Sequence, residues 1–240
     1  MITVREPYDG EWGPLARVAG YAGMDEAELS ALGVGDVRLG SAVPRRALGV
    51  KAFRKALLKD HGTLGVSGTP LMLSSTVLIA VTTTNRVAGV GVVSPDVQEI
   101  QSVAARGGAQ EPIFTLRGLA NIHRLRGVGV DPDFRGRGVG RALLNALVWH
   151  YRLSGMSLLQ GRLPAGSGKE VRGFLRGSGF RVTAPGVSLD ISRIFGIPAV
   201  LAPAPGERLF YQGLQNPGAD DWELPGLMGD AGGDAGSAAS

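Results

Sequence analysis

The chain has 240 residues, with 25 Lys and Arg against 21 Asp and Glu, which gives a formal net charge of +4 at pH 7. Hydrophobic residues make up 44% and charged residues 19%, a composition that suits a globular core and excludes wholesale disorder. There is no cysteine, so disulfide scaffolds, thiol nucleophiles and Cys-based metal sites are excluded. The three histidines form no HxxxH pair, and we predict no metal site.

The basic residues are unevenly distributed. Residues 1–212 hold all 25 Lys and Arg and 16 of the acidic residues, a net charge of +9, whereas residues 213–240 hold five acids and no base. A basic body suits an anionic ligand such as a phosphorylated cofactor, an acidic substrate or RNA, although an ordinary solvated surface fits equally well. Residues 1–12 lack the apolar core of a secretory signal, and no run approaches the ~18 apolar residues of a membrane span. We therefore expect a soluble, cytoplasmic protein.

The first half of the chain predicts a strand, two helices and a hairpin. Residues 2–7 alternate weakly as a strand does, and apolar residues recur at helical spacing over about 12–18 and 44–59. Two β-branched runs, 76–84 and 86–94, meet at Asn85, a residue type that tolerates a left-handed turn, and predict a hairpin. Residues 95–119 show no sustained period, which indicates an inserted loop with at most one short helix.

The second half alternates strands and helices. We predict strands over 121–130, 156–163, 180–184 and 208–212, and helices over 141–153 and 168–176. A second inserted loop covers about 185–205. Together, residues 1–212 predict one α/β domain with mixed strand pairing, and the Gly, Ala and acidic composition of 213–240 predicts a flexible tail.

The stretch richest in chemistry is the loop between the strand 121–130 and the helix 141–153. It reads DPDFRGRGVGR over residues 131–141, with glycines at alternate positions and three arginines. Such glycines let the backbone approach a bulky ligand, and the unpaired N–H groups at the start of the next helix favour an anion. The loop therefore predicts a cradle for a phosphate or pyrophosphate.

Two familiar phosphate loops fit poorly. A dinucleotide fold needs GxGxxG and an acid about 20 residues later, but here the spacing is GxGxG and position 160 is Gln160. A Walker loop needs GxxxxGK[ST], but the GSGKE at 166–170 has Leu163 and Glu170 where Gly and Ser or Thr belong.

A third pattern fits. Residues 135–140 (RGRGVG) match the R/Q-x-x-G-x-G/A signature of the GNAT superfamily of acyl-CoA-dependent N-acetyltransferases, and residues 174–180 (FLRGSGF) resemble the family's F-Y-x-x-x-G-F segment. The order of predicted elements over about 1–212 is also similar to that family. The resemblance implies an α/β (α+β) fold with a mixed, mostly antiparallel sheet, splayed middle strands and helices on both faces.

The resemblance also implies a reaction and a set of binding residues. The reaction is transfer of an acetyl group from acetyl-CoA to a primary amine of a small molecule, protein or peptide. Main-chain groups would face the pantetheine arm, loop N–H groups would hold the pyrophosphate, and one aromatic ring would pack near the arm. The implied cofactor-binding residues are Val128, Gly129, Val130, Arg135, Gly136, Arg137, Gly138, Val139, Gly140, Arg141 and Phe174.

The sequence departs from the family where catalysis is concerned. Leu175 stands where many members have a Tyr that acts as general acid, and Arg124 stands where some members carry a Glu or His base. His123 is adjacent but of opposite parity, so it could serve as base only if a bulge turned its strand. His123 is therefore a candidate catalytic residue, and otherwise the catalytic groups are not resolved.

Two other functions stay open beside the N-acetyltransferase. The missing Tyr and base also fit a GNAT-like module that binds acyl-CoA with little or no turnover. The basic body fits a toxin-type enzyme that acetylates aminoacyl-tRNA, although no run of Lys and Arg with interleaved aromatics is present. We expect neither a membrane partner nor a metal, and a homodimer is possible.

Overall fold

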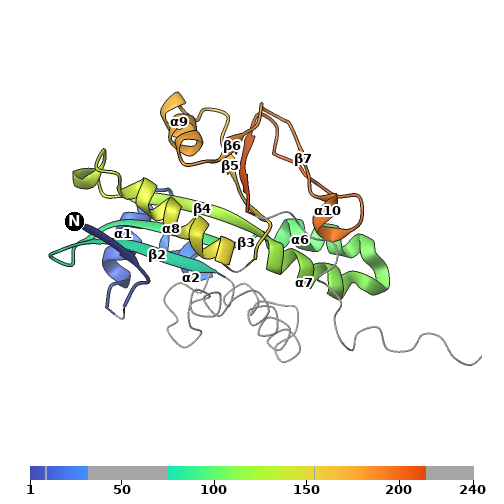
Figure 1. The fold of residues 1–240 in the computed structure, drawn as a ribbon, viewed down its shortest axis with the longest axis horizontal. Helices are drawn as coiled ribbons and strands as arrows, with labels where there is room; N and C mark the ends of the chain where they lie inside the picture. The colour runs from blue at the N-terminus through green and yellow to red at the C-terminus, as the bar shows by residue number, and fades with distance from the viewer. Residues whose placement is uncertain (9, 32–74, 154, 215–240) are drawn as a thin grey trace, which may run out of the picture.

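The computed structural model describes residues 1–8, 10–31, 75–153 and 155–214, and its centre is a seven-stranded sheet in the order β1-β2-β3-β4-β5-β9-β6 (Figure 1). Among the described strands of this sheet only β4 and β5 pair in parallel, and the other neighbours are antiparallel. This confirms the predicted mixed, mostly antiparallel sheet. The strands are β1 (Ile2–Arg5), β2 (Thr76–Thr82), β3 (Val87–Pro95), β4 (Ile122–Val130), β5 (Leu158–Leu163), β6 (Arg181–Val182) and β9 (Arg208–Gly213).

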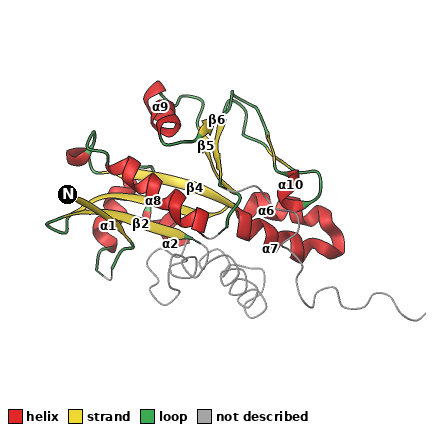
Figure 2. Cartoon of the chain, viewed as in Figure 1, coloured by secondary structure: helices red, strands yellow, loops and turns green. Residues whose placement is uncertain are grey.

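Helices cover both faces of the sheet, as predicted (Figure 2). On one face, α8 (Val139–Leu153) buries Leu143, Leu144 and Leu147 against β2, β3 and β4. On the other face, α1 (Trp12–Gly20) and α2 (Glu26–Ala31) bury Leu15, Val18 and neighbouring apolar residues against β2 and β3. Each helix is amphipathic, so burial of its apolar stripe fixes which side meets the sheet.

The approach of α8 to β3 requires glycine. A Cβ built on Gly91 would lie 2.8 Å from Leu147 Cδ1, and one built on Gly89 would lie 2.8 Å from Val139 Cγ1. These positions let the first turns of α8 sit directly on the strand. The hairpin before them is as predicted, with Asn85 at a φ of 58° in the turn between β2 and β3.

The two central strands, β4 and β5, separate after three residue pairs. β4 and β5 are paired only from Ile122–Leu158 to Arg124–Gln160, although β4 continues to Val130 and β5 to Leu163. In Figure 1 the two strands run away from each other beyond this point. The predicted splay of the middle strands is therefore present, and the edge of β4 that faces β5 pairs with none of the described strands over its last six residues.

The prediction of an inserted loop over residues 95–119 is wrong. Residues 95–119 are not a loop, because α6 (Val97–Ala104) and α7 (Glu111–Asn121) pack against each other there, joined by the 3-10 segment η2 (Ala105–Gln110). Each helix is short, and Gly107 and Gly108 separate them, so neither shows a sustained helical period. α6 buries Ile100 and Val103.

The second expected loop, about 185–205, also contains regular elements. They are β7 (Leu189–Asp190), the short helix α10 (Ser192–Phe195) and β8 (Val200–Leu201), with β7 and β8 forming a separate two-stranded sheet. The remaining helices are the 3-10 turn η3 (Pro132–Phe134) and α9 (Lys169–Gly177). The helix predicted over 44–59 and nearly all of the predicted tail lie outside the described residues.

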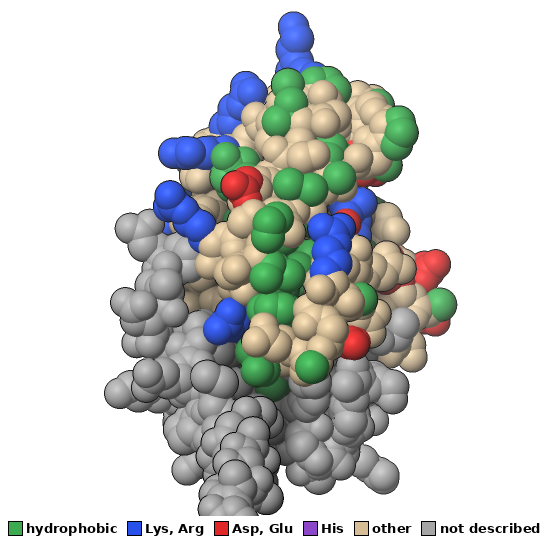
Figure 3. All heavy atoms as spheres, turned by 90° about the vertical axis from the view of Figure 1, so that its right-hand side faces the viewer, with side chains coloured by type: hydrophobic (Ala, Val, Ile, Leu, Met, Phe, Trp, Pro, Cys, Tyr) green, Lys and Arg blue, Asp and Glu red, His purple; other side chains and the backbone are tan. Residues whose placement is uncertain are grey.

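The surface reflects the basic composition. On the end of the molecule shown in Figure 3, Lys and Arg side chains outnumber Asp and Glu around a band of hydrophobic side chains. This end of the protein therefore presents positive charge.

Candidate functional site

The Gly-Arg loop turns sharply between the end of β4 and the start of α8. Gly136 and Gly138 have φ values of 73° and 81°, a backbone conformation that favours glycine. A Cβ built on either residue meets no atom within 4 Å, so both face open space. The chain thus forms an exposed, glycine-lined turn where the sequence predicts an anion cradle.

The first amides of α8 are available to a ligand. The first hydrogen bond of the helix runs from Ala142 N to Gly138 O, at 2.9 Å. The N–H groups of Val139, Gly140 and Arg141 precede it and have no acceptor within the helix. Aligned with the positive end of the helix dipole, they favour a negative group at this point.

A cavity of about 400 Å³ opens beside these amides. Ligand pockets are typically about 300–1,000 Å³, so the hollow can take part of a cofactor-sized molecule. It joins the loop, the free edge of β4 and α9. Its lining residues are Val128, Val130, Phe134, Arg135, Gly136, Gly138, Val139, Gly140, Arg141 and Phe174.

The cavity brings together nine of the eleven residues implied by the resemblance. The two that do not line it are Gly129, whose missing Cβ points toward Val18 on α1, and Arg137, whose guanidinium lies 5.7 Å from the centre of the Phe134 ring. Phe134 lines the cavity but was not predicted to do so. Its signal was its place two residues before the glycines, inside the same motif.

A charged clip, formed by Asp131 with Arg17 and Arg86, fixes the start of the loop to other elements. Asp131 is 2% exposed, and its Oδ2 accepts hydrogen bonds from Arg17 Nη2 on α1 and Arg86 Nη2 at the start of β3, each at 3.1 Å. Its Oδ1 accepts the Asp133 N–H at 3.1 Å, which caps η3. Burial alone would raise the pKa of Asp131, but these hydrogen bonds outweigh burial and lower it. The carboxylate therefore stays ionised and ties the loop to two other elements.

The aromatic contact to the cavity is close. A Cβ on Gly140 would lie 3.2 Å from Phe174 Cζ and 3.5 Å from Val130 Cγ2. The Phe174 ring thus leans against the first turn of α8. Leu175, which follows it, is 4% exposed and belongs to the core, so it offers no proton donor to the cavity.

The structure places His123 inside the protein. Its side chain is fully buried, and its ring centre lies 5.1 Å from that of Tyr151 on α8. β4 does contain a bulge, because Val92 pairs with Gly127 and Val93 with Leu125, which leaves Arg126 as the extra residue. The bulge comes after His123, and it changes the parity of the residues beyond it rather than that of His123.

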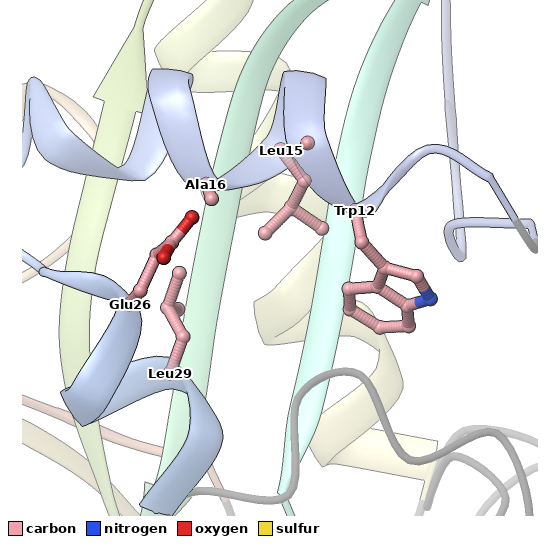
Figure 4. Close-up of a pocket in the computed structure, with 6 residues that line it drawn as sticks. Trp12, Leu15, Ala16, Glu26 and Leu29 are labelled. Carbon is pink, nitrogen blue, oxygen red and sulfur yellow. The ribbon is translucent and has the colours of Figure 1, made fainter.

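A second, smaller hollow of about 230 Å³ lies between α1 and α2 (Figure 4). Trp12, Leu15, Ala16 and Leu29 give it mainly apolar walls, and Glu26 is its charged residue. It lies on the face of the sheet opposite α8, away from the glycine loop. None of the residues that line it is among those that the resemblance assigns to the cofactor.

Comparison with known families identifies the class of the domain. Residues 74–182 match the sequence model of the acetyltransferase (GNAT) domain. The match spans the hairpin, the parting strands, the glycine loop, α8 and α9. The match assigns residues 74–182, a little under half of the chain, to the GNAT acetyltransferase domain, whose family uses acetyl-CoA.

Solved structures offer more distant likenesses. The ribosomal-protein-S18-alanine N-acetyltransferase of Escherichia coli is 11% identical, with 90% of this chain and 96% of that chain covered and a TM-score of 0.47. An acetyltransferase of the GNAT family from Staphylococcus aureus Mu50 is 12% identical, with 90% and 100% covered and a TM-score of 0.47. The yncA protein of Salmonella typhimurium, solved with its cofactor acetyl-CoA, is 16% identical, with 90% and 95% covered and a TM-score of 0.45.

No curated protein matches the sequence significantly. None of the helices in the described part of the chain is long and apolar enough to cross a membrane.

Proposed function

We propose that this protein is an N-acetyltransferase that binds acetyl-CoA between β4 and β5 and acetylates a primary amine. The observation that carries the proposal is the coincidence of two features: the central strands part after Arg124–Gln160, and the unpaired amides of α8 lie at the cavity beside the free edge of β4. A long, flexible arm ending in a pyrophosphate suits such a gap and such a helix start. The acetyltransferase domain that we propose covers residues 1–212, the bounds that the sequence predicts.

Each part of the cavity has a role in this proposal. The N–H groups from Gly136 to Arg141 bind the pyrophosphate, with Arg135 and Arg141 adding positive charge. Main-chain groups of Val128, Gly129 and Val130, on the strand edge without a partner, bind the amides of the pantetheine arm. Phe174 packs against that arm.

Catalysis then depends on orientation rather than on a dedicated acid. Acetyl-CoA supplies the activated acetyl group when it is bound. The protein holds the amine nitrogen against that group, and positioning of two reactants can contribute about 7–11 kcal/mol to lowering a barrier. Since Leu175 has no proton to give, the departing CoA thiolate takes a proton from water, and the attacking amine loses its proton to water.

A pair of variants at Gly138 tests the proposal. Gly138→Asp places a carboxylate where backbone N–H groups meet the pyrophosphate, and Gly138→Asn has nearly the same shape and the same left-handed backbone but no charge. The site has room for either side chain, because a Cβ there meets nothing within 4 Å. We expect the Asp variant to lose at least tenfold more affinity for CoA than the Asn variant in calorimetry. Both variants should melt at similar temperatures, because the strain of a side chain at a φ of 81° is common to the two.

Equal affinities in the two variants would contradict the pyrophosphate site. CoA binding without CoA release on a broad amine panel would favour the binding module instead. An aminoacyl-tRNA acceptor would be recognised by RNA retention that falls steeply with salt.

A further inference from the structure

A cluster of polar side chains gathers where β4 and β5 part, on the face opposite α8. Arg124 and Gln160 form the last pair between the two strands, so their side chains leave the sheet side by side on the same face. Ser94 is the partner of Arg124 on β3, and Arg126 reaches the same face, because its Nε donates to Ser94 Oγ at 2.7 Å. The cluster therefore lies at the mouth of the gap that the proposed function assigns to acetyl-CoA.

Two arginines in this cluster have no carboxylate partner. Neither Arg124 nor Arg126 forms an ion pair within the described residues, whereas Arg162, two residues after Gln160, is paired with Glu99. Arg126 also donates through Nη2 to Pro95 O, at 3.4 Å. A guanidinium has five N–H donors, so within the described part of the chain most of the donors of Arg126 and all of those of Arg124 have no protein acceptor and can bind a ligand.

The surroundings of Arg126 disfavour the charged form of its side chain. Burial lowers its pKa, and the neighbouring charges of Arg124 and Arg162 lower it further, against the opposite effect of Asp96 and Glu28. An anion placed between the two arginines would relieve this repulsion. The fork geometry of guanidinium suits a carboxylate or a phosphate.

The other side of the cluster carries acceptors. Gln160 is fully buried, and its Nε2 donates to Asp96 Oδ2 at 2.6 Å, while Asp96 is itself 3% exposed. The amide cannot be turned over, because its oxygen would then face the carboxylate. Gln160 Oε1 has no hydrogen-bond partner in the structure, although it is buried. A buried carbonyl without a donor is uncommon, and an N–H donor from a ligand would satisfy it.

We propose that the acceptor is a compact zwitterion, an amine that carries a carboxylate or phosphate a few bonds away; this inference rests on the proposed function. Arg124 and Arg126 bind the anionic group, Gln160 Oε1 accepts a hydrogen bond from the amine, and Asp96 orients Gln160 and supplies negative charge beside it. Adjacent strands lie about 4.8 Å apart, so the two half-sites start from neighbouring backbones and suit an acceptor whose amine and anionic group are a few bonds apart. A single arginine pair suits a small anion better than the long basic track that a nucleic acid needs.

The test compares acceptors that differ only in the anionic group. The standard amino acids and β-alanine are assayed for CoA release against their carboxamides, and 2-aminoethyl phosphate against ethanolamine, so that carboxylate and phosphate are distinguished. We expect the preferred anionic acceptor to exceed its neutral counterpart about 10- to 100-fold in kcat/KM, the range of a hydrogen bond to a charged group. The ratio should fall toward one in Arg124→Met and Arg126→Met and be partly kept in Arg126→Lys.

The matched control is Arg106→Met, which removes one exposed positive charge from the segment between α6 and α7. It should leave the ratio unchanged. A parent enzyme that acetylates neutral and anionic amines equally would overturn the zwitterion site while the proposed function stands.

A binding measurement separates the two ideas if turnover is absent. The CoA-saturated protein is titrated with the same pairs of compounds by calorimetry. Preferential binding of the anionic member, lost in Arg126→Met, would support the site even without acetylation and would count against the proposed function alone. Equal or undetectable binding of both members would overturn the site.

Discussion

At the scale of single residues, the closest approach between α1 and the sheet is set by one missing side chain. A Cβ on Gly129 would lie 2.2 Å from Val18 O, which is a backbone atom and cannot turn aside. Gly127 lies two residues earlier on β4 and faces the segment between α1 and α2. It is less constrained, because its Cβ would lie 3.0 Å from the Ala22 Cβ and from the flexible end of Met24. Gly129 therefore holds the strand and α1 in contact beside the candidate cavity.

We expect Gly129→Ala to destabilise the fold more than Gly127→Ala does. Overpacking against backbone typically costs about 1–3 kcal/mol or more, whereas a methionine end can move at lower cost. Denaturant unfolding of both variants measures the difference. Equal unfolding free energies, or a more stable Gly129→Ala, would show that α1 does not pack as the structure has it.

His123 gives a second residue-scale prediction. Because its side chain is fully buried against Tyr151, we expect His123→Leu to change the melting temperature while lowering kcat/KM by less than about tenfold. A positioned general base typically contributes about 10²–10⁴-fold. A loss of ~10³-fold with CoA affinity intact would make His123 the base after all.

How far the sequence predicts the site depends on how local its signal is. The glycine loop could be predicted, because Gly136, Gly138 and the following helix start are contiguous and their backbone chemistry is general. The cluster of Arg124, Gln160 and Asp96 could not, because it depends on the register between β3, β4 and β5, which are far apart in the sequence. In the sequence alone, Arg124 is distinguished only by standing where some family members carry a base.

At the scale of elements, the Asp131 carboxylate links β4 to α1 and β3 through Arg17 and Arg86. Its folded pKa lies below the ordinary value of 3.8, so its ionised form stabilises the folded state above that pH. The stabilisation is lost as the pH falls through the lower, folded pKa.

Asp131→Asn should therefore melt several degrees below the parent at pH 7, and the gap should narrow as the pH falls below 3.8. Thermal melts of the two proteins across pH 2–7 measure it, and other titrating groups cancel in the difference. A gap that is constant or widens in acid would mean that the clip does not depend on the charge of Asp131.

Which helices the sequence predicts also depends on how far a local apolar pattern extends. α8 was predicted because it spans 15 residues with an uninterrupted apolar stripe. α6 and α7 were not, since α6 has only 8 residues and two glycines follow it before α7 begins. Their helical state comes from packing against each other and against neighbouring elements, which a short window of sequence does not contain.

At the scale of the whole molecule, the chain divides into a basic body and an acidic C-terminal segment, and the boundary can be placed more finely than composition allowed. Leu214 is 9% exposed and packs in the α8 core, and its N–H donates to Ser157 O at 3.0 Å. Gly213, the last residue of β9, and Leu214 therefore belong to the folded body, although the sequence predicts that the body ends at residue 212.

We expect truncation after Leu214 to leave the melting temperature and the affinity for CoA nearly unchanged, because residues 215–240 hold few apolar side chains among Gly, Ala and acids. Truncation after Gly213 should lower the melting temperature by removing a core leucine. The comparison needs only two shortened proteins and thermal melts. A large drop in the longer one would indicate that the acidic segment docks on the body.

In the proposed function, the gap beside β4 and the start of α8 both contact the same CoA molecule. Amide hydrogen exchange with and without CoA tests it directly, because the binding groups are backbone N–H groups. We expect bound CoA to slow exchange at the amides from Gly136 to Arg141 and along 128–130, with little change on α6 and α7. CoA binding that leaves these amides unchanged and protects another part of the chain would contradict it.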